Sequence, residues 1–156
     1  MDCGNSESLN ITGAITLEAW INIKNFTDAG YLLARNLASP SSSMQYGIYL
    51  DAGEIVNIVA EQNIWNTGKI ITIGEWTHLV ALYKSGSYRK LYLNGVYQTE
   101  TTCPTISSRN WKLLIGARND NGAQAYHFNG LIDEVAIFDI ALTAEEIKKR
   151  YQAGRP

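Results

Sequence analysis

The last thirty residues constrain the fold more than any other part of the chain. Residues 131–138 form a run typical of a β-strand, and Thr143 begins a helix soon afterwards. The spacing from Thr143 to Glu146 is that of a capping box, in which the hydroxyl accepts from one backbone N–H and the carboxylate accepts from another. Ile147 and Tyr151 are four residues apart and share one helical face. We therefore expect a strand of a β-sandwich, followed by one short helix on its surface.

The rest of the sequence predicts a series of successive β-strands. Residues 15–23 alternate between apolar side chains and a mixed set, which predicts a half-buried strand with Trp20 on its second face. Residues 76–83 are apolar on both faces, which favours a central position in a sheet. The pair Asn94 and Gly95 is typical of a hairpin, because a type I′ turn needs positive φ at both central residues. About ten short strands, spaced roughly 8–12 residues apart, predict an all-β sandwich.

Composition limits the classes of partner. The 156 residues are enough for one domain with a real core. Thirteen basic and fifteen acidic residues give a net charge of −2, and the absence of a basic stripe excludes nucleic acid as a partner. The sequence contains no run of about eighteen apolar residues, so it predicts no membrane span. No signal peptide precedes Asp2, so we expect residues 1–156 to be a single domain excised from a longer, exported parent; the alternative is a cytosolic protein with its natural start.

Two cysteines, Cys3 and Cys103, permit one disulfide. Such a bridge closes a long loop and adds roughly 4 kcal/mol in the chain-entropy model. The alternative is two separate, partly buried thiols, because cysteine often packs as a small hydrophobic residue. The sequence leaves both readings open, since it does not place the two Cα atoms.

Four stretches of the chain, taken in order, resemble laminin-G-like domains of the concanavalin A-like lectin/glucanase superfamily. They are residues 4–21, residues 46–50, residues 74–84 with 91–96, and residues 128–151. The resemblance implies a jelly-roll β-sandwich of two curved antiparallel sheets with one short C-terminal helix. It also implies an extracellular or cell-surface module that binds glycans, other proteins or matrix, often with a structural calcium.

The chain departs from that family at its beginning. Relatives usually carry a further strand before the segment that starts here at Asp2. We therefore expect an uncovered sheet edge, or a weakened core near Cys3, unless another segment fills the gap.

The sequence does not predict catalysis. Glucan-hydrolysing relatives carry a Glu-x-Asp-x-x-Glu pattern on one strand, and retaining hydrolysis needs two carboxyls about 5–5.5 Å apart. That triplet does not occur in this chain, and the neighbours Asp133 and Glu134 would point to opposite faces of a strand. The sequence also contains none of the common nucleophile-elbow, phosphate-loop or zinc-protease motifs. We therefore predict a protein that is not an enzyme.

A structural calcium is predicted from the resemblance alone. Asp133 is then the expected side-chain ligand and Asn5 the second, with backbone carbonyls supplying the rest. The alternative is that Asp133 only accepts hydrogen bonds from backbone N–H groups at a strand end. Cysteine and histidine never cluster, so no zinc-type site is expected.

Candidate ligand-binding residues are aromatic side chains with amide or charged neighbours on loops. Trp65 and Asn66 lie in residues 62–68, an irregular polar stretch ahead of an expected strand over residues 69–73. Trp111 has a similar setting at the entry to another strand. The alternative for each ring is a lid that covers one end of the sandwich.

A second group of candidates surrounds a polar loop late in the chain. Tyr126 follows closely on Arg118 and Asn119, which offer a guanidinium and an amide beside the ring. Trp20 and Trp76, by contrast, lie within strong strand patterns and are assigned to core packing.

These observations predict a non-catalytic carbohydrate-binding or adhesion module whose partner is a glycan, a polysaccharide or another protein. The alternative is a structural or protein-interaction domain of a surface, viral or filament protein. The sequence does not identify the ligand.

Overall fold

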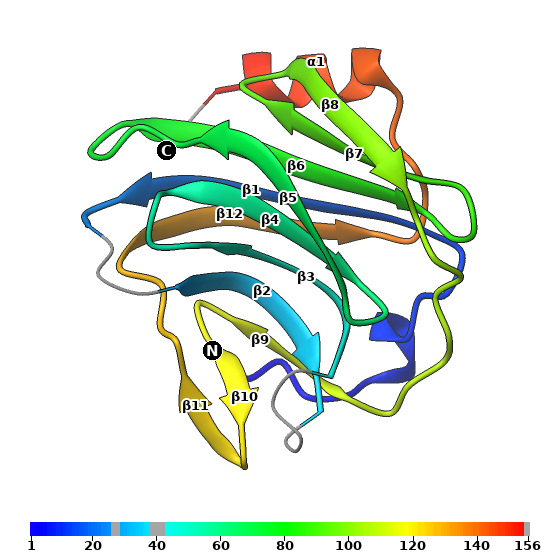
Figure 1. Cartoon of the computed structure of the whole chain (residues 1–156). Helices are drawn as coiled ribbons and strands as arrows, with labels where there is room; N and C mark the ends of the chain where they lie inside the picture. The colour runs from blue at the N-terminus through cyan, green and yellow to red at the C-terminus, as the bar shows by residue number, and fades with distance from the viewer. Residues whose placement is uncertain (26–28, 38–42, 155–156) are drawn as a thin grey trace.

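The protein is a sandwich of two five-stranded antiparallel sheets, seen in a computed structural model that describes residues 1–25, 29–37 and 43–154 (Figure 1). The first sheet has the order β12 (Gly130–Phe138), β1 (Ala14–Ile23), β6 (Trp76–Lys84), β7 (Tyr88–Leu93) and β8 (Val96–Thr102). The second has the order β5 (Asn63–Ile70), β4 (Ile55–Ala60), β3 (Met44–Leu50), β2 (Gly30–Asn36) and β9 (Lys112–Ile115). The predicted all-β jelly-roll sandwich is confirmed.

Three smaller elements complete the described part of the chain. They are a 3-10 turn, η1 (Glu7–Leu9), a separate two-stranded hairpin, β10 (Arg118–Asp120) with β11 (Ala123–Ala125), and the helix α1 (Ala144–Gln152). In Figure 1 the helix covers the outer side of the first sheet, and the hairpin projects from the opposite side of the molecule. The helix and the hairpin therefore lie on opposite sides of the sandwich.

Strand β1 is buried on both faces, whereas the sequence predicted a half-buried strand. Its inward side chains, such as Ile15 and Leu17, are fully buried between the sheets. Its outward side chains are buried as well, because α1 and the segment before it lie on them. The Thr16 hydroxyl donates to the carbonyl of Ile140 at 2.7 Å and accepts from the N–H of Leu142 at 3.1 Å. These two hydrogen bonds hold the segment between β12 and α1 against β1.

The predicted helix start is confirmed atom by atom. The Thr143 hydroxyl accepts from the N–H of Glu146 at 3.2 Å, and the Glu146 carboxylate accepts from the N–H of Thr143 at 2.7 Å. Ile147 is fully buried against Val80 and Leu82 of β6. The helix therefore adds a second, smaller core on the outer face of the first sheet.

The expected open edge near Cys3 does not exist, because the first four residues themselves pair with β9. The Cys3 N–H donates to the carbonyl of Leu113, and the N–H of Ile115 donates to the carbonyl of Met1, both at 2.9 Å. Cys3 and Cys103 are free thiols that pack against the core, which decides between the two readings of the sequence. Burial raises the pKa of Cys103 to about 11, so that thiol stays protonated and unreactive at neutral pH.

Candidate functional site

The hairpin β10–β11 is held against the second sheet by one buried asparagine. Asn36, at the end of β2, donates through its side chain to the carbonyl of Asn119 at 2.6 Å. Its side-chain oxygen accepts from the N–H of Asn119 at 3.1 Å. This amide replaces the backbone partner that a neighbouring strand would supply, so the hairpin has a fixed position on β2.

Four side chains gather beside the hairpin, and we call them the tyrosine–arginine cluster: Tyr31, Tyr49, Arg118 and Tyr126. Tyr31 and Tyr49 stack with ring centroids 4.8 Å apart, and Tyr126 meets Tyr31 edge-on at 6.1 Å. The Arg118 guanidinium lies 4.0 Å from the centre of the Tyr126 ring and 5.2 Å from that of Tyr31. The cluster belongs to the outer face of the second sheet, since Tyr49 lies between two inward-facing residues of β3.

The backbone of Tyr126 is strained to bring its ring to this place. Its φ is +53°, in the left-handed region that bulky side chains rarely adopt. Such a conformation costs of order 1–3 kcal/mol and persists where the surroundings enforce it. Here the carbonyl of Tyr126 accepts from the N–H of Tyr31 at 3.0 Å, and the following residue, His127, forms an isolated bridge with Tyr31. Tyr126 as a whole is 36% exposed, with the Arg118 guanidinium over one face of its ring.

The cluster offers hydrogen-bond donors more than acceptors. Arg118 donates to the Tyr31 hydroxyl at 3.0 Å, while its nearest carboxylate, Asp120, lies 3.9 Å away. The Nε atom of Arg118 is buried and has no hydrogen-bond partner among the described residues. Burial raises the pKa of Tyr31 against the opposing charge of Arg118, so the hydroxyl keeps its proton and can donate it. A ligand rich in oxygen acceptors fits this arrangement.

A small hollow of about 200 Å³ lies beside Asn36. Its walls include Trp111, Asn119 and Asn5, with Asn5 donating to the side chain of Asn110 at 2.8 Å. The side-chain oxygen of Asn119 is buried without a partner among the described residues. The structure thus brings five of the predicted residues to the hairpin: Asn5, Trp111, Arg118, Asn119 and Tyr126.

Trp65 does not belong to this region, and its predicted loop is wrong. Strand β5 begins at Asn63, six residues earlier than expected, and Trp65 pairs with Ile58 and packs against the core between the sheets. Glu61 and Gln62 both have positive φ and form a two-residue hairpin turn, so β5 begins at Asn63. Buried Arg89 of β7 donates to the Asn63 carbonyl at 2.8 Å and to its side chain at 2.6 Å. Asn66 is exposed on the outer face of β5, where it accepts from the N–H of Gly68.

The two predicted calcium ligands lie beside different sheets. Asp133 is exposed on β12, and its side chain accepts from the N–H of Glu134 at 2.8 Å. Glu134 has a φ of +49° and forms the bulge where β12 slips against β1. Among residues 1–25, 29–37 and 43–154, no group of three or more His, Cys, Asp or Glu side chains is placed to hold a metal ion. Calcium therefore stays a prediction.

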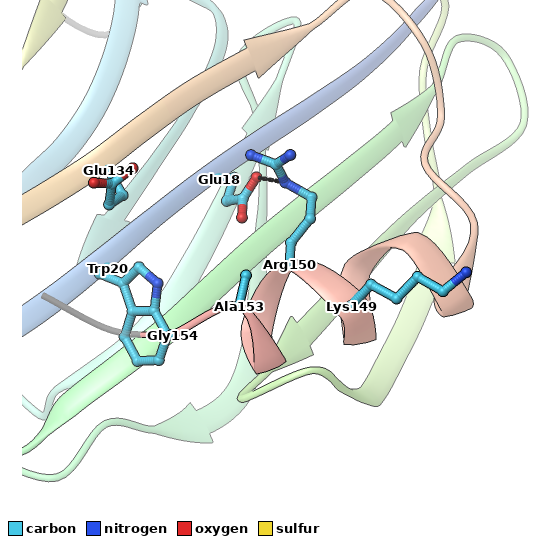
Figure 2. Close-up of a pocket in the computed structure, with 7 residues that line it drawn as sticks. All are labelled: Glu18, Trp20, Glu134, Lys149, Arg150, Ala153 and Gly154. Atoms are coloured by element: carbon cyan, nitrogen blue, oxygen red, sulfur yellow. Dashed lines mark hydrogen bonds and ion pairs between the residues drawn. The ribbon is translucent and has the colours of Figure 1, made fainter.

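A buried carboxylate, which the sequence patterns did not single out, lies beneath the helix. Glu18 of β1 accepts from His78 Nε2 at 2.7 Å and from Arg150 Nε at 2.5 Å, so both of its oxygens are engaged. Burial opposes its ionisation, but the hydrogen bonds from His78 and Arg150 outweigh that effect and hold the pKa of Glu18 below its usual value. Glu18 and Glu134 line one hollow of about 490 Å³ (Figure 2).

None of the described helices is long and apolar enough to cross a membrane.

Known proteins with similar sequences include an adhesion receptor. Human adhesion G-protein coupled receptor D1 is 35% identical over 83 residues, which is 51% of this chain and 9% of the receptor. The chain thus matches only a small part of that protein.

Solved structures with the same fold are distant in sequence. A "putative carbohydrate binding protein" from Bacteroides ovatus aligns with 89% of this chain and 41% of its own, at 14% identity and a TM-score of 0.70. The NanB sialidase of Streptococcus pneumoniae aligns with 96% of this chain and 26% of its own, at 16% identity and a TM-score of 0.76. A heptameric pentraxin from Limulus polyphemus aligns with 90% and 71%, at 17% identity and a TM-score of 0.64.

The family model for laminin-G-like domains of the concanavalin A-like lectin/glucanase superfamily matches residues 2–148. That range includes both sheets, the hairpin and the start of the helix. The chain therefore belongs to this family.

Proposed function

We propose that the chain is a non-catalytic carbohydrate-binding or adhesion module of an extracellular or cell-surface protein, and that a glycan binds at the tyrosine–arginine cluster. The observation that carries the proposal is the partly exposed Tyr126, with the Arg118 guanidinium 4.0 Å from the centre of its ring. An aromatic ring can cover the apolar face of a sugar, and the donors beside it can bind its hydroxyl oxygens. Family membership and the carbohydrate-binding protein with the same fold support this choice.

The chemistry of the cluster supports binding rather than hydrolysis. A glycosidase needs two carboxyls on either side of the scissile bond. The carboxylate of Asp120 faces Arg118 at 3.9 Å, and the charge of Asp51 acts on Tyr49 at the other end of the cluster. The paired oxygens of Glu18 are committed to His78 and Arg150 on the other sheet. We therefore propose that the module holds its glycan without transforming it.

Replacing Arg118 or Tyr126 with alanine is expected to weaken glycan binding by at least tenfold, or about 1.4 kcal/mol. A glycan array first identifies the bound sugar, and isothermal titration calorimetry then measures the affinity of each variant. Lys84→Ala is the matched control, because Lys84 is an exposed basic residue at the end of β6, in the other sheet. A blank array, or variants that bind as tightly as the parent, would refute the proposal.

A protein-interaction module is the second candidate function. The edge strand β5 exposes Ile64 by 57% and Ile70 by 65%, and the similar receptor is an adhesion protein. Exposed apolar side chains on an edge strand favour contact with another protein. Sedimentation that depends on concentration, together with a blank glycan array, would select this candidate.

Calcium binding at Asp133 is proposed with a separate test, and Asn5 is left out of the site because it lies beside the other sheet. Asp133→Asn keeps an acceptor for the N–H of Glu134 but removes the charge that a calcium ion needs. We expect EDTA to lower the melting temperature of the parent protein and to leave that of Asp133→Asn unchanged. A parent protein that does not respond to EDTA would contradict the assignment.

A further inference from the structure

A groove runs around the C-terminal half of α1, on the outer face of the first sheet. It consists of three hollows of about 490, 460 and 500 Å³. The first and second share Trp20 and Gly154, and the second and third share Asn94, Tyr151 and Gln152. Because successive hollows share lining residues, they adjoin one another along the helix, and we call the three together the helix groove. Figure 1 places this side of the molecule opposite the hairpin.

Aromatic side chains line the groove along its length. Trp20 of β1 is buried beneath the groove against Tyr151, as the sequence predicted. Trp76 of β6 is only half-buried, although the sequence assigned it to the core. Tyr151 comes from the helix, and Tyr97 of β8 is 47% exposed at the far end. Rings of this kind provide apolar area with little conformational entropy to lose on binding.

Amide groups stand beside these rings at the centre of the groove. Asn94 is fixed in the β7–β8 turn, since its N–H donates to the carbonyl of His78 at 2.8 Å and its side-chain oxygen accepts from the N–H of His78 at 3.0 Å. Its side-chain N–H groups remain as donors. Gln152 is exposed and brings both a donor and an acceptor. Paired amides of this type match the adjacent hydroxyl groups of a sugar ring.

The walls of the groove are rigid. Trp20 stacks on Tyr151 with ring centroids 5.7 Å apart. A Cβ atom added at Gly95, where φ is +73°, would lie 3.0 Å from the Tyr151 side chain, so the β7–β8 turn packs directly on the helix. Sites on such elements lose little free energy to reorganisation when a ligand binds.

Charges are confined to the ends of the groove and come in both signs. Figure 2 shows the end where Glu134, Lys149 and Arg150 lie, with Arg150 pointing to Glu18. The central hollow has no charged side chain among its lining residues in the described chain. A ligand along the whole groove therefore needs many hydroxyl groups and apolar ring faces but no net charge.

We propose that the helix groove is a second binding site, for a linear neutral oligosaccharide with one sugar ring on Trp76 and its hydroxyls bonded to Asn94 and Gln152. The inference goes beyond the proposed function, because it uses no residue of the hairpin. It makes the module bivalent, with one site on the outer face of each sheet. Two sites on opposite sides can engage two glycan chains, which raises the avidity for a polysaccharide surface.

The four tryptophans make the test specific, because they lie in different places. Trp20 and Trp76 line the helix groove, Trp111 lines the hollow at the hairpin, and Trp65 packs between the sheets. The indole N–H signals of the 15N-labelled whole chain are assigned with single Trp→Phe variants. The protein is then titrated with cellohexaose, laminarihexaose, mannohexaose and xylohexaose. We expect at least one of them to shift the Trp76 and Trp20 signals and to leave the Trp65 signal in place.

Variants separate the two sites. Gln152→Ala changes an exposed helix residue and is expected to weaken the Trp76 response at least threefold; Trp76→Ala is expected to weaken calorimetric binding about tenfold or more. Arg118→Ala should leave the Trp76 shift unchanged. If no hexasaccharide moves the Trp76 signal, or if Gln152→Ala has no effect, the second site is refuted. A shift of Trp111 alone, lost in Arg118→Ala, would refute the groove and leave the proposed function standing.

Discussion

Replacing Gly130 with alanine is expected to lower the free energy of unfolding by about 3 kcal/mol, the upper end of the range for overpacked sites. A Cβ atom at this position would lie 2.2 Å from the carbonyl oxygen of Asn22 and 2.8 Å from the ring of Phe128. The Asn22 carbonyl is backbone, held in the pairing of β1 with β12, so no rotamer change can relieve the clash. Urea unfolding followed by tryptophan fluorescence measures the loss.

Gly13→Ala is the matched control for this prediction. A Cβ atom at Gly13 would meet nothing within 4 Å, and neither glycine has a positive φ. The two substitutions therefore differ in the space available and not in backbone strain. Gly13→Ala should leave stability unchanged or raise it by up to about 1 kcal/mol, since alanine has less freedom in the unfolded chain. Equal midpoints for the two variants would show that β1 and β12 can move apart at little cost.

The elements that the sequence predicted well are those that local physics decides. The capping box needs only Thr143 and Glu146 at the right spacing, and it forms as expected. The type I′ turn needs only Asn94 and Gly95, whose φ angles are +51° and +73°. Each depends on residues within one turn of chain, so no distant contact can change the outcome.

The errors occur where contacts from far along the chain decide burial. The second face of β1 is buried by a helix that begins about 120 residues later. The first residue of β5, Asn63, is bound by Arg89, 26 residues away on β7. The edge of β9 is covered by residues 1–4, across more than a hundred residues. Alternation along one segment carries no information about such partners.

The candidate site also contains residues that the sequence predicted and residues that it did not. Arg118, Asn119 and Tyr126 were found because an aromatic with polar neighbours on a loop is visible locally. Tyr31 and Tyr49, which complete the cluster, lie within regular strands, and only the folded sheet places their rings beside the hairpin. The strained φ of Tyr126 also has no sequence signal, because no glycine or asparagine stands there.

Replacing Glu18 with glutamine is expected to destabilise the protein by about 2 kcal/mol, within the range for hydrogen bonds to charged groups. Both oxygens of Glu18 accept a hydrogen bond, one from His78 and one from Arg150. Glutamine has one acceptor and one donor, so it keeps both contacts only if His78 takes the tautomer with its proton on Nδ1, an atom that is buried without a hydrogen-bond partner among the described residues. His78 is fully buried and has no other place to donate, whereas Arg150 is 42% exposed and can turn to water. Because Arg150 can bond to water instead, the loss of stability is smaller than for an ion pair whose two partners are both buried. Urea unfolding at neutral pH measures the effect.

The pH dependence of stability provides the second readout for Glu18. The pKa of Glu18 is lower in the folded state than in the unfolded chain. Between that lower pKa and about pH 4.5, the folded protein therefore binds fewer protons than the unfolded chain. The stabilisation from Glu18 is complete above that pH and is lost as the pH falls through the folded pKa. Glu18→Gln should therefore flatten the acid limb of the stability curve, with a remaining slope from Asp2 and Glu146, whose pKa values hydrogen bonding also lowers. Glu145→Gln, which breaks only the exposed pair with Lys149, should leave both the midpoint and the acid limb unchanged. If Glu18→Gln follows the parent curve at every pH, the buried carboxylate does not hold the helix on the sheet.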